Sequence, residues 1–208
     1  MAGVKRKLTS RGRERRQQIL TESARLFAER GYHPTAVADI VTSLGVGKGV
    51  FYWYFESKED LFLEILASSS QDLRRRQQAA IGDEPDPLRR IELGIRASLA
   101  WFREHRRLIN LQQFAATEER FAAALRQHDA VAIDDITRHL KEAMAEGRVP
   151  AAQDPAMLAH ALVGATRHLA RTYLLSADEP VDVVADVAVR FVIGGLVGAE
   201  PEERGISR

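Results

Sequence analysis

The sequence predicts an all-α protein of about nine helices, in which a small N-terminal domain of three helices precedes a larger helical domain. Apolar residues recur at the 3.6-residue period of an α-helix in nearly every segment, and no segment shows the apolar–polar alternation of a strand. Glycine or proline follows several of these periodic segments, as expected where one helix ends and a short turn begins.

Three helices make up a predicted domain at residues 13–60. The first covers residues 13–30 and ends at Gly31, because glycine tolerates the backbone geometry of a helix C-terminus. Thr35 is a suitable N-cap for the second, which carries apolar residues at positions i, i+3, i+4 and i+7. The third is a short helix expected over residues 47–55.

The rest of the chain reads as a linking helix and five further helical patterns. The linking helix is expected at about residues 57–78, since Ser57-Lys58-Glu59-Asp60 has the spacing of a capping box. The turn-forming sequence DEPDP then marks a boundary, so the second domain is placed at residues 82–208. Its helices are expected at residues 87–105, 106–115, 118–146, 154–175 and 181–197.

Composition and hydropathy exclude several classes of protein. The chain contains no cysteine, which rules out disulfides and thiolate metal sites and fits a reducing compartment. The basic N-terminus lacks the apolar core of a secretory signal. The longest uncharged apolar stretch, at residues 191–199, is far shorter than the ~20 residues of a membrane helix. We therefore expect a cytoplasmic protein that contacts no membrane.

Charge is distributed unevenly along the chain. Residues 1–60 hold eleven Lys or Arg against seven Asp or Glu, whereas residues 61–208 hold nineteen against twenty-two. The positive charge is densest in a basic arm at residues 1–16. This asymmetry suggests that the front of the chain meets a polyanion, with a solvated, solubilising tail as the alternative.

Five consecutive aromatics, Phe51 to Phe55, follow a glycine-rich turn in the stretch GVGKGVFYWYF at residues 45–55. A phosphate-binding loop does not fit, because Gly49 stands after Lys48 where that motif has Ser or Thr, and no strand precedes. A purely structural role explains Phe51 and Phe55, which share one helical face. It leaves the other rings unexplained, because a helix cannot bury five consecutive residues against a small partner.

A helix-turn-helix, in which two short helices are joined by a tight glycine turn, explains both the inner and the outer rings. Its second helix enters the major groove of DNA. Lys48 then meets a phosphate or a guanine edge, and Tyr52 and Tyr54 offer hydroxyls to phosphates. Trp53 presents a flat apolar face to a sugar or a thymine methyl group. In this interpretation, the basic arm reaches into an adjacent minor groove or remains a solubilising tail.

The stretch LFAERGYHPTAVADIVTSLGVGKGVFYWYFESKEDL resembles the DNA-binding domain of TetR-family transcriptional regulators, and the resemblance covers roughly residues 15–66. It implies a homodimer that binds double-stranded operator DNA and is released by a small-molecule effector, whose identity the sequence does not give. In each subunit the linking helix joins the DNA-binding domain to a ligand-sensing and dimerising domain. The DNA-binding residues that it implies are Thr35, Lys48, Gly49, Val50, Tyr52, Trp53, Tyr54 and Lys58, with Thr35 capping the second helix and Lys58 beside the DNA backbone.

Aromatic and basic residues of the second domain are candidates for a ligand pocket, with plain core or surface roles as the alternative. The histidines show no metal-ligand spacing, so neither a metal nor a cofactor is expected. Arg167 either receives a ligand anion or pairs with a carboxylate. The pocket candidates are Trp101, Phe102, Phe114, Phe121, Leu125, His128 and Arg167.

The last two helices carry apolar stripes rich in Ala, Gly, Val and Leu, which suit a four-helix interface between two copies of the chain. The candidate interface residues are Leu158, Leu162, Ala165, Leu169, Val184, Ala188, Phe191 and Gly195.

Two other functions remain open. A helical enzyme is the alternative from another class, but no Ser/His/Asp or Cys/His arrangement and no cluster of metal ligands is present. An enzyme also leaves the aromatics beside Lys48 unexplained. The second alternative keeps the DNA-binding fold and makes the protein an activator or an architectural factor.

Overall fold

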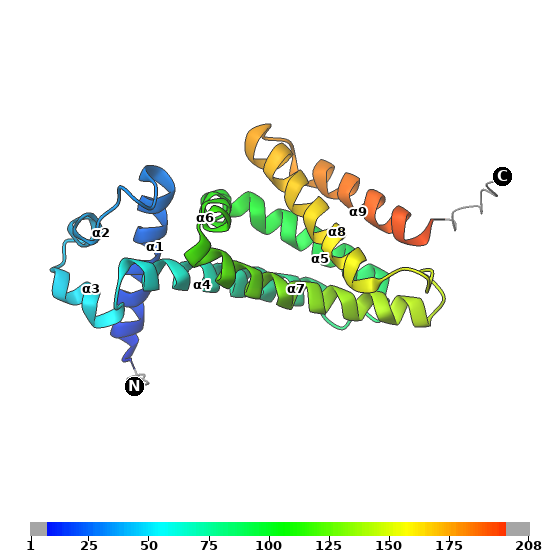
Figure 1. The fold of residues 1–208 in the computed structure, drawn as a ribbon, viewed down its shortest axis with the longest axis horizontal. Helices are drawn as coiled ribbons and strands as arrows, with labels where there is room; N and C mark the ends of the chain where they lie inside the picture. Colours follow the sequence, from blue (N-terminus) through cyan, green and yellow to red (C-terminus); the bar gives the residue numbers. More distant parts are fainter. Residues whose placement is uncertain (1–7, 199–208) are drawn as a thin grey trace. The chain divides into compact units, whose positions relative to one another are not determined.

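The computed structural model describes residues 8–198, and every element in that range is helical, which confirms the all-α fold class (Figure 1). The first part of the chain forms α1 (Ser10–Arg30), α2 (Val37–Ser43), α3 (Lys48–Tyr54) and α4 (Lys58–Ile81). The remainder forms α5 (Pro87–Glu104), α6 (Arg106–Thr117), α7 (Glu119–Ala145), α8 (Pro155–Leu169), a π-helical segment η1 (Ala170–Ser176), and α9 (Val181–Val197). Residues 1–7 of the expected basic arm lie outside the described residues.

Local signals explain where several helices begin and end. Asp86 caps α5, since its side chain accepts hydrogen bonds from the backbone N–H groups of Leu88 and Arg89, and proline occupies the first helical position. Asp154 caps α8 in the same way. Gly31, with a φ of 89°, ends α1 in a conformation that other residues rarely adopt.

The cap of α2 differs from the expected one. Ala36 occupies the N-cap position, and its backbone N–H donates to Oδ2 of Asp39 at 2.7 Å. Thr35 is buried one residue earlier, and its hydroxyl donates to the carbonyl oxygen of Gly31 at 2.8 Å. The prediction that Thr35 caps this helix was therefore wrong: its hydroxyl closes the turn after α1 instead.

The chain divides into two compact units that do not follow the expected boundary near residue 82. Among the described residues, the first unit contains residues 8–69 and 107–125, and the second contains residues 70–106 and 126–198. Helices α4 and α7 each contribute residues to both units. The segment 107–125 belongs to the first unit because its apolar side chains complete that unit's core.

The core of the first unit contains a cluster of aromatic rings around Tyr32. The ring of Tyr32 lies 4.9 Å from that of Phe62, 5.4 Å from that of Phe114 and 5.2 Å from that of Phe121, measured between centroids. Tilted and edge-on contacts of this kind add to the free energy that burial alone contributes. These rings attach α6 and the start of α7 to α4 and to the segment between α1 and α2.

The second unit packs α5 against α9, with α8 and η1 beside them. Its interior is mainly aliphatic, with Ile95, Leu99 and Val184 among the buried residues. An ion pair between Arg96 and Asp186, at 2.8 Å, joins α5 to α9. The carbonyl oxygen of Leu174, in η1, accepts hydrogen bonds from both Arg103 and Arg106.

Candidate functional site

The helix-turn-helix is built by α2, a glycine turn and α3. Gly45 has a φ of 64°, which lets the chain reverse, and the N–H of Val46 donates to the carbonyl oxygen of Val41 at 2.9 Å. Gly47 is the N-cap of α3. The buried residues Ile40 and Val41 fix α2 against the core, so that α3 is held at the edge of the unit by the turn and by its own inner face.

The five consecutive aromatics divide between the two faces of α3. Phe51 and Phe55 are buried, with ring centroids 5.8 Å apart. Tyr52 is 57% exposed and Trp53 is 63% exposed, although Trp side chains are highly buried on average. Tyr54 is half-buried against the core. Packing thus accounts for the inner rings and leaves the outer ones facing solvent.

The remaining candidates on α3 lie near the outer rings. Lys48 and Gly49 are exposed, and Val50 is half-buried. A Cβ atom added to Gly47 or Gly49 would meet no atom within 4 Å, and neither glycine has a positive φ. The fold of the monomer therefore does not require glycine at either position.

Lys58 and Thr35 occupy a different environment from the residues of α3. The Lys58 ammonium donates to the backbone carbonyl oxygens of Tyr32 at 2.8 Å, Thr35 at 2.9 Å and His33 at 3.3 Å. Burial, with a contribution from the charge of Arg120, lowers the pKa of Lys58. An ammonium has three N–H donors, and all three are engaged here. Both residues therefore hold the chain between α1 and α2 and are poorly placed to contact DNA.

A cavity of about 270 Å³ lies within the second unit. Its walls come from the C-terminal half of α4, from α5, from α7 and from α8. The apolar part of the wall includes Leu73, Ile91, Ile95, Phe102, Ile136 and Leu162. The polar part includes Arg74, Arg90, His139, Thr166 and Arg167. The cavity thus offers an apolar body with several hydrogen-bonding groups at its wall, as small-molecule sites commonly do.

Only two of the expected pocket residues, Phe102 and Arg167, line this cavity. Trp101 is fully buried elsewhere in the second unit, where its indole N–H donates to Oδ2 of Asp72 at 2.7 Å. His128 is not part of the cavity wall. Phe114, Phe121 and Leu125 belong to the first unit, where they pack in or against its core. The prediction that these five residues line the pocket is therefore corrected. Trp101 and the three residues of the first unit contact other partners, and His128 lies outside the cavity wall.

The structure also brings residues to the cavity that the sequence analysis did not select. Arg74, Arg90 and Thr166 line the cavity and were not among the expected pocket residues. Their spacing along the helices places them near a face that points inward. The spacing alone does not show whether that face contacts another helix or lines an open space.

The candidate interface residues of α8 and α9 fall on both sides of their helices. Leu162, Val184 and Ala188 are buried within the chain, whereas Phe191 and Gly195 are exposed. Leu158, Ala165 and Leu169 are half-buried. The exposed apolar face of α9 contains Val183 at 54%, Val187 at 44% and Phe191 at 69%, spaced four residues apart. Met157 on α8 is 70% exposed.

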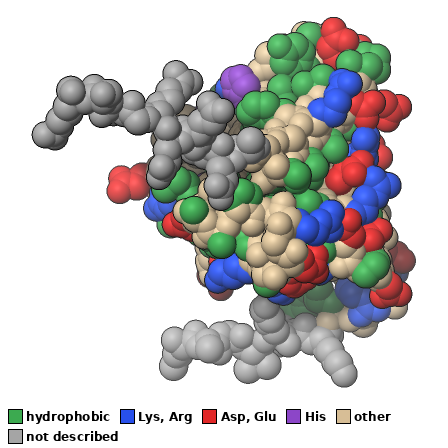
Figure 2. Space-filling model, turned by 90° about the vertical axis from the view of Figure 1, so that its right-hand side faces the viewer, with side chains coloured by type: hydrophobic (Ala, Val, Ile, Leu, Met, Phe, Trp, Pro, Cys, Tyr) green, Lys and Arg blue, Asp and Glu red, His purple; other side chains and the backbone are tan. Residues whose placement is uncertain are grey.

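Three further properties of the described residues are the charge on one face, the hydropathy of the helices and the grouping of possible metal ligands. On its uncovered part, the face shown in Figure 2 carries apolar side chains among both Lys/Arg and Asp/Glu side chains, so positive charge is not concentrated there. Within the described part of the chain, none of the helices combines the length and the hydropathy that a membrane span requires. No group of three His, Cys, Asp or Glu suited to a metal ion occurs among residues 8–198.

The helix-turn-helix coincides with a known family domain. Residues 19–65 match the family described as bacterial regulatory proteins, tetR family. The HTH-type transcriptional regulator TtgR of Pseudomonas putida is 30% identical over 201 residues, which cover 92% of this chain and 94% of TtgR. The chain belongs to the TetR family. This TetR-family protein is a DNA-binding transcriptional regulator and not an enzyme.

Two further comparisons show similarity over most of the chain. The HTH-type transcriptional activator FasR of Mycolicibacterium smegmatis is 31% identical over 189 residues, which cover 88% of this chain and 83% of FasR. The crystal structure of the transcriptional regulator FadR from Bacillus subtilis in complex with stearoyl-CoA superposes with a TM-score of 0.78. It covers 86% of this chain and 98% of that one at 17% identity, which shows a common fold.

Proposed function

We propose that this TetR-family regulator is a homodimeric repressor that leaves its operator when a small molecule enters the cavity of the second unit. The observation that carries the proposal is the division of α3, whose inner rings are buried while Tyr52 and Trp53 face solvent. A helix held only by its inner face leaves its outer face available to the major groove. The DNA-contacting residues are then Lys48, Gly49, Val50, Tyr52, Trp53 and Tyr54.

The two glycines at the start of α3 support this assignment. Glycine within a helix is less favourable than alanine by roughly 0.5–1 kcal/mol, and at Gly49 there is room for a methyl group. Glycine is useful where another backbone must come close, and N–H groups at a helix N-terminus favour phosphate. We therefore place the DNA backbone against Gly47 and Gly49. Thr35 and Lys58 act indirectly, by holding the chain between α1 and α2.

Self-association is supported by the exposed face of α9. Val183, Val187 and Phe191 form an apolar row that is exposed among the described residues, and Met157 adds an exposed apolar side chain on α8. Burying apolar surface is worth about 25 cal/mol per Å². A contiguous exposed apolar patch therefore often marks a surface that another molecule covers. A two-fold interface of α8 and α9 with their copies in a second chain covers them.

The path from ligand to DNA follows from which helices line the cavity. The C-terminal half of α4 lines it through Leu73 and Arg74, while the first turns of the same helix bury Leu61 and Phe62 in the core of the first unit. Helix α7 has the same property, with His139 at the cavity and Phe121 in that core. A ligand that moves either helix therefore also acts on the unit that carries α3. In the dimer this movement changes the separation of the two copies of α3, which must enter major grooves ~34 Å apart.

One experiment tests the regulatory role. Purified protein is titrated onto labelled DNA from upstream of its own gene, with unlabelled nonspecific competitor and at several salt concentrations. Binding should survive competitor and weaken steeply with salt. Tyr52→Ala should lower the affinity, and Lys48→Ala should lower both the affinity and the salt dependence if its ammonium meets a phosphate. Equal, weak binding to all fragments would contradict sequence-specific recognition of this DNA.

Activation is the second candidate, because the relative FasR is an activator. Deleting the gene separates the two modes. Transcription of the adjacent genes should rise in the deletion strain if the protein is a repressor. A fall in transcription on deletion would favour activation and would leave the assignment of α3 unchanged.

A further inference from the structure

Positive charge exceeds negative charge at the wall of the cavity in the second unit. Four arginines line it, namely Arg74, Arg90, Arg138 and Arg167, together with one carboxylate, Asp135. Two carboxylates outside the wall pair with them, Glu142 with Arg90 and Asp129 with Arg167. The four guanidinium groups therefore share three carboxylates.

The shortage of negative charge falls on Arg74. Asp135 is the carboxylate that Arg74 and Arg138 share: it lies 2.9 Å from Nη2 of Arg138 but 3.6 Å from Nη2 of Arg74. The second distance is too long for a hydrogen bond, so Arg74 has only a loose ion pair. Arg167 differs, because both of its terminal nitrogens donate to Asp129.

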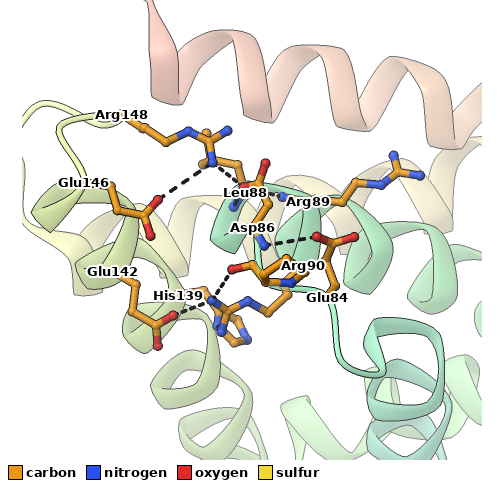
Figure 3. Close-up of polar contacts among 10 residues, drawn as sticks. Glu84, Asp86, Leu88, Arg89, Arg90, His139, Glu142, Glu146 and Arg148 are labelled. Carbon is orange, nitrogen blue, oxygen red and sulfur yellow. Dashed lines mark hydrogen bonds and ion pairs between the residues drawn. The ribbon is translucent and has the colours of Figure 1, made fainter.

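Histidine does not add to this positive charge. Nη1 of Arg90 lies 3.2 Å from Nδ1 of His139 and donates to it, which requires that nitrogen to be unprotonated (Figure 3). Burial, followed by the charges of Arg90 and Arg138, lowers the pKa of His139, while Glu142 and Asp135 oppose this. Arg90 itself is held by Glu142 at 2.5 Å and by the carbonyl oxygen of Pro85 at 3.1 Å.

Among residues 8–198, three buried polar atoms of cavity-lining residues have no hydrogen-bond partner: Nε of Arg74, Nε of Arg90 and Oγ1 of Thr166. Thr166 is only 5% exposed, so water outside the fold does not readily satisfy its hydroxyl. A guanidinium N–H can only donate a hydrogen bond, whereas a hydroxyl can either donate or accept one. All three atoms can therefore be satisfied by a ligand that presents hydrogen-bond acceptors.

We infer that the effector of this regulator is a small amphipathic carboxylic acid, whose apolar body fills the cavity and whose carboxylate binds the guanidinium of Arg74. The cavity volume of about 270 Å³ equals that of roughly nine water molecules, so the body has on the order of ten non-hydrogen atoms. The carboxylate supplies the missing negative charge, and its oxygens accept from a donor that has no partner. This inference rests on the proposed role of the cavity as the effector site.

The test compares three probes that share one alkyl chain: octanoate, the uncharged 1-octanol, and octanoyl-CoA, in which a thioester replaces the carboxylate. Binding to the full-length protein is measured by titration calorimetry. Octanoate should bind at least roughly tenfold more tightly than octanol, because a charge-assisted hydrogen bond is lost with the alcohol. Equal affinity for the two, or binding of the thioester with none of the acid, would overturn the inference.

Substitutions of Arg74 test whether the carboxylate of octanoate binds to this residue. Arg74→Gln should weaken octanoate by about tenfold or more and leave octanol unchanged, and Arg74→Lys should recover part of the loss. Arg75→Gln is the matched control, since it removes the same charge from the next residue of α4, which pairs with Asp72 and does not line the cavity. Undiminished binding of octanoate to Arg74→Gln would overturn the inference, as would an equal loss in both variants.

A separate readout distinguishes this inference from the proposed function. Each protein is first bound to the DNA fragment without any probe, and its own affinity serves as its reference. With octanoate, the wild-type protein should leave the DNA and the variant should stay bound. If octanoate binds through Arg74 but DNA binding is unaffected, the effector role fails and the carboxylate site stands. If octanoyl-CoA alone releases the DNA, the regulatory role stands and the carboxylate inference fails.

Discussion

Nζ of Lys58 lies 2.8 Å from the backbone carbonyl oxygen of Tyr32 and 4.3 Å from the centroid of the same residue's ring. The side chain at the first position of α4 thus ties this helix to the segment between α1 and α2. Because Tyr32 is also the centre of the aromatic core, one lysine connects the backbone and the core of the first unit.

The first prediction separates this role from DNA contact. Lys58→Met should lower the free energy of unfolding by about 3 kcal/mol, because it leaves three carbonyl oxygens without their charged donor. Lys48→Met, which alters an exposed residue of α3, should leave stability within about 0.5 kcal/mol and weaken DNA binding. Urea denaturation and DNA titration of both variants check this. Normal stability of Lys58→Met with lost DNA binding would restore Lys58 as a DNA contact.

The second prediction concerns the start of α3. Gly49→Ala should raise stability by roughly 0.5–1 kcal/mol, because alanine is the better helix former and its Cβ would meet no atom within 4 Å. The same change should weaken operator binding if a DNA backbone approaches this glycine. Thermal unfolding and DNA titration of the variant measure the two effects. A variant that is more stable and binds DNA fully would show that the DNA backbone does not lie against Gly49.

The third prediction concerns acid stability. Hydrogen bonds from Arg25 and Ser43 lower the pKa of Glu22 to about 2, and the bond from Ser43 joins α1 to α2. A carboxyl group whose pKa is lowered by folding stabilises the folded state above its unfolded pKa, about 4.5, and loses that contribution as the pH falls toward 2. Glu22→Gln should lower stability at pH 7 and reduce the slope of stability between pH 4.5 and pH 2.

The measurement is a series of urea denaturations from pH 7 to pH 2 on the wild-type protein and the variant. Ser43→Ala should produce part of the same change, since it removes one of the three side-chain hydrogen bonds to the Glu22 carboxylate. An unaltered pH slope in Glu22→Gln would mean that this carboxylate does not contribute to acid unfolding.

The fourth prediction tests the proposed interface. Phe191→Arg should convert the dimer to monomer, because it places a charge at the most exposed residue of the apolar row of α9. Tyr52→Arg is the control, since it introduces the same charge at an exposed aromatic of α3, which is 57% exposed. Light scattering coupled to size-exclusion chromatography gives the mass of each. A dimeric Phe191→Arg would place the interface elsewhere.

The sequence by itself determined the helices and the family. The expected helix at 13–30 is found at Ser10–Arg30, and the one at 181–197 is found at Val181–Val197. Such agreement is possible because helical period, capping residues and glycine stops are local signals that do not depend on the rest of the fold. The division of the rings on α3 was visible for the same reason, since residues four apart share a face.

Only the tertiary structure decided which partner each apolar or charged face meets. Phe114 and Phe121 have the spacing of either core or pocket residues, and they join the first unit because their partners are Tyr32 and Phe62, far away in the sequence. Lys58 reads as a surface cation until the three carbonyl oxygens around it are known. The cavity and the incomplete pairing of Arg74 depend on four helices at once, and no local pattern encodes the space that remains between packed helices.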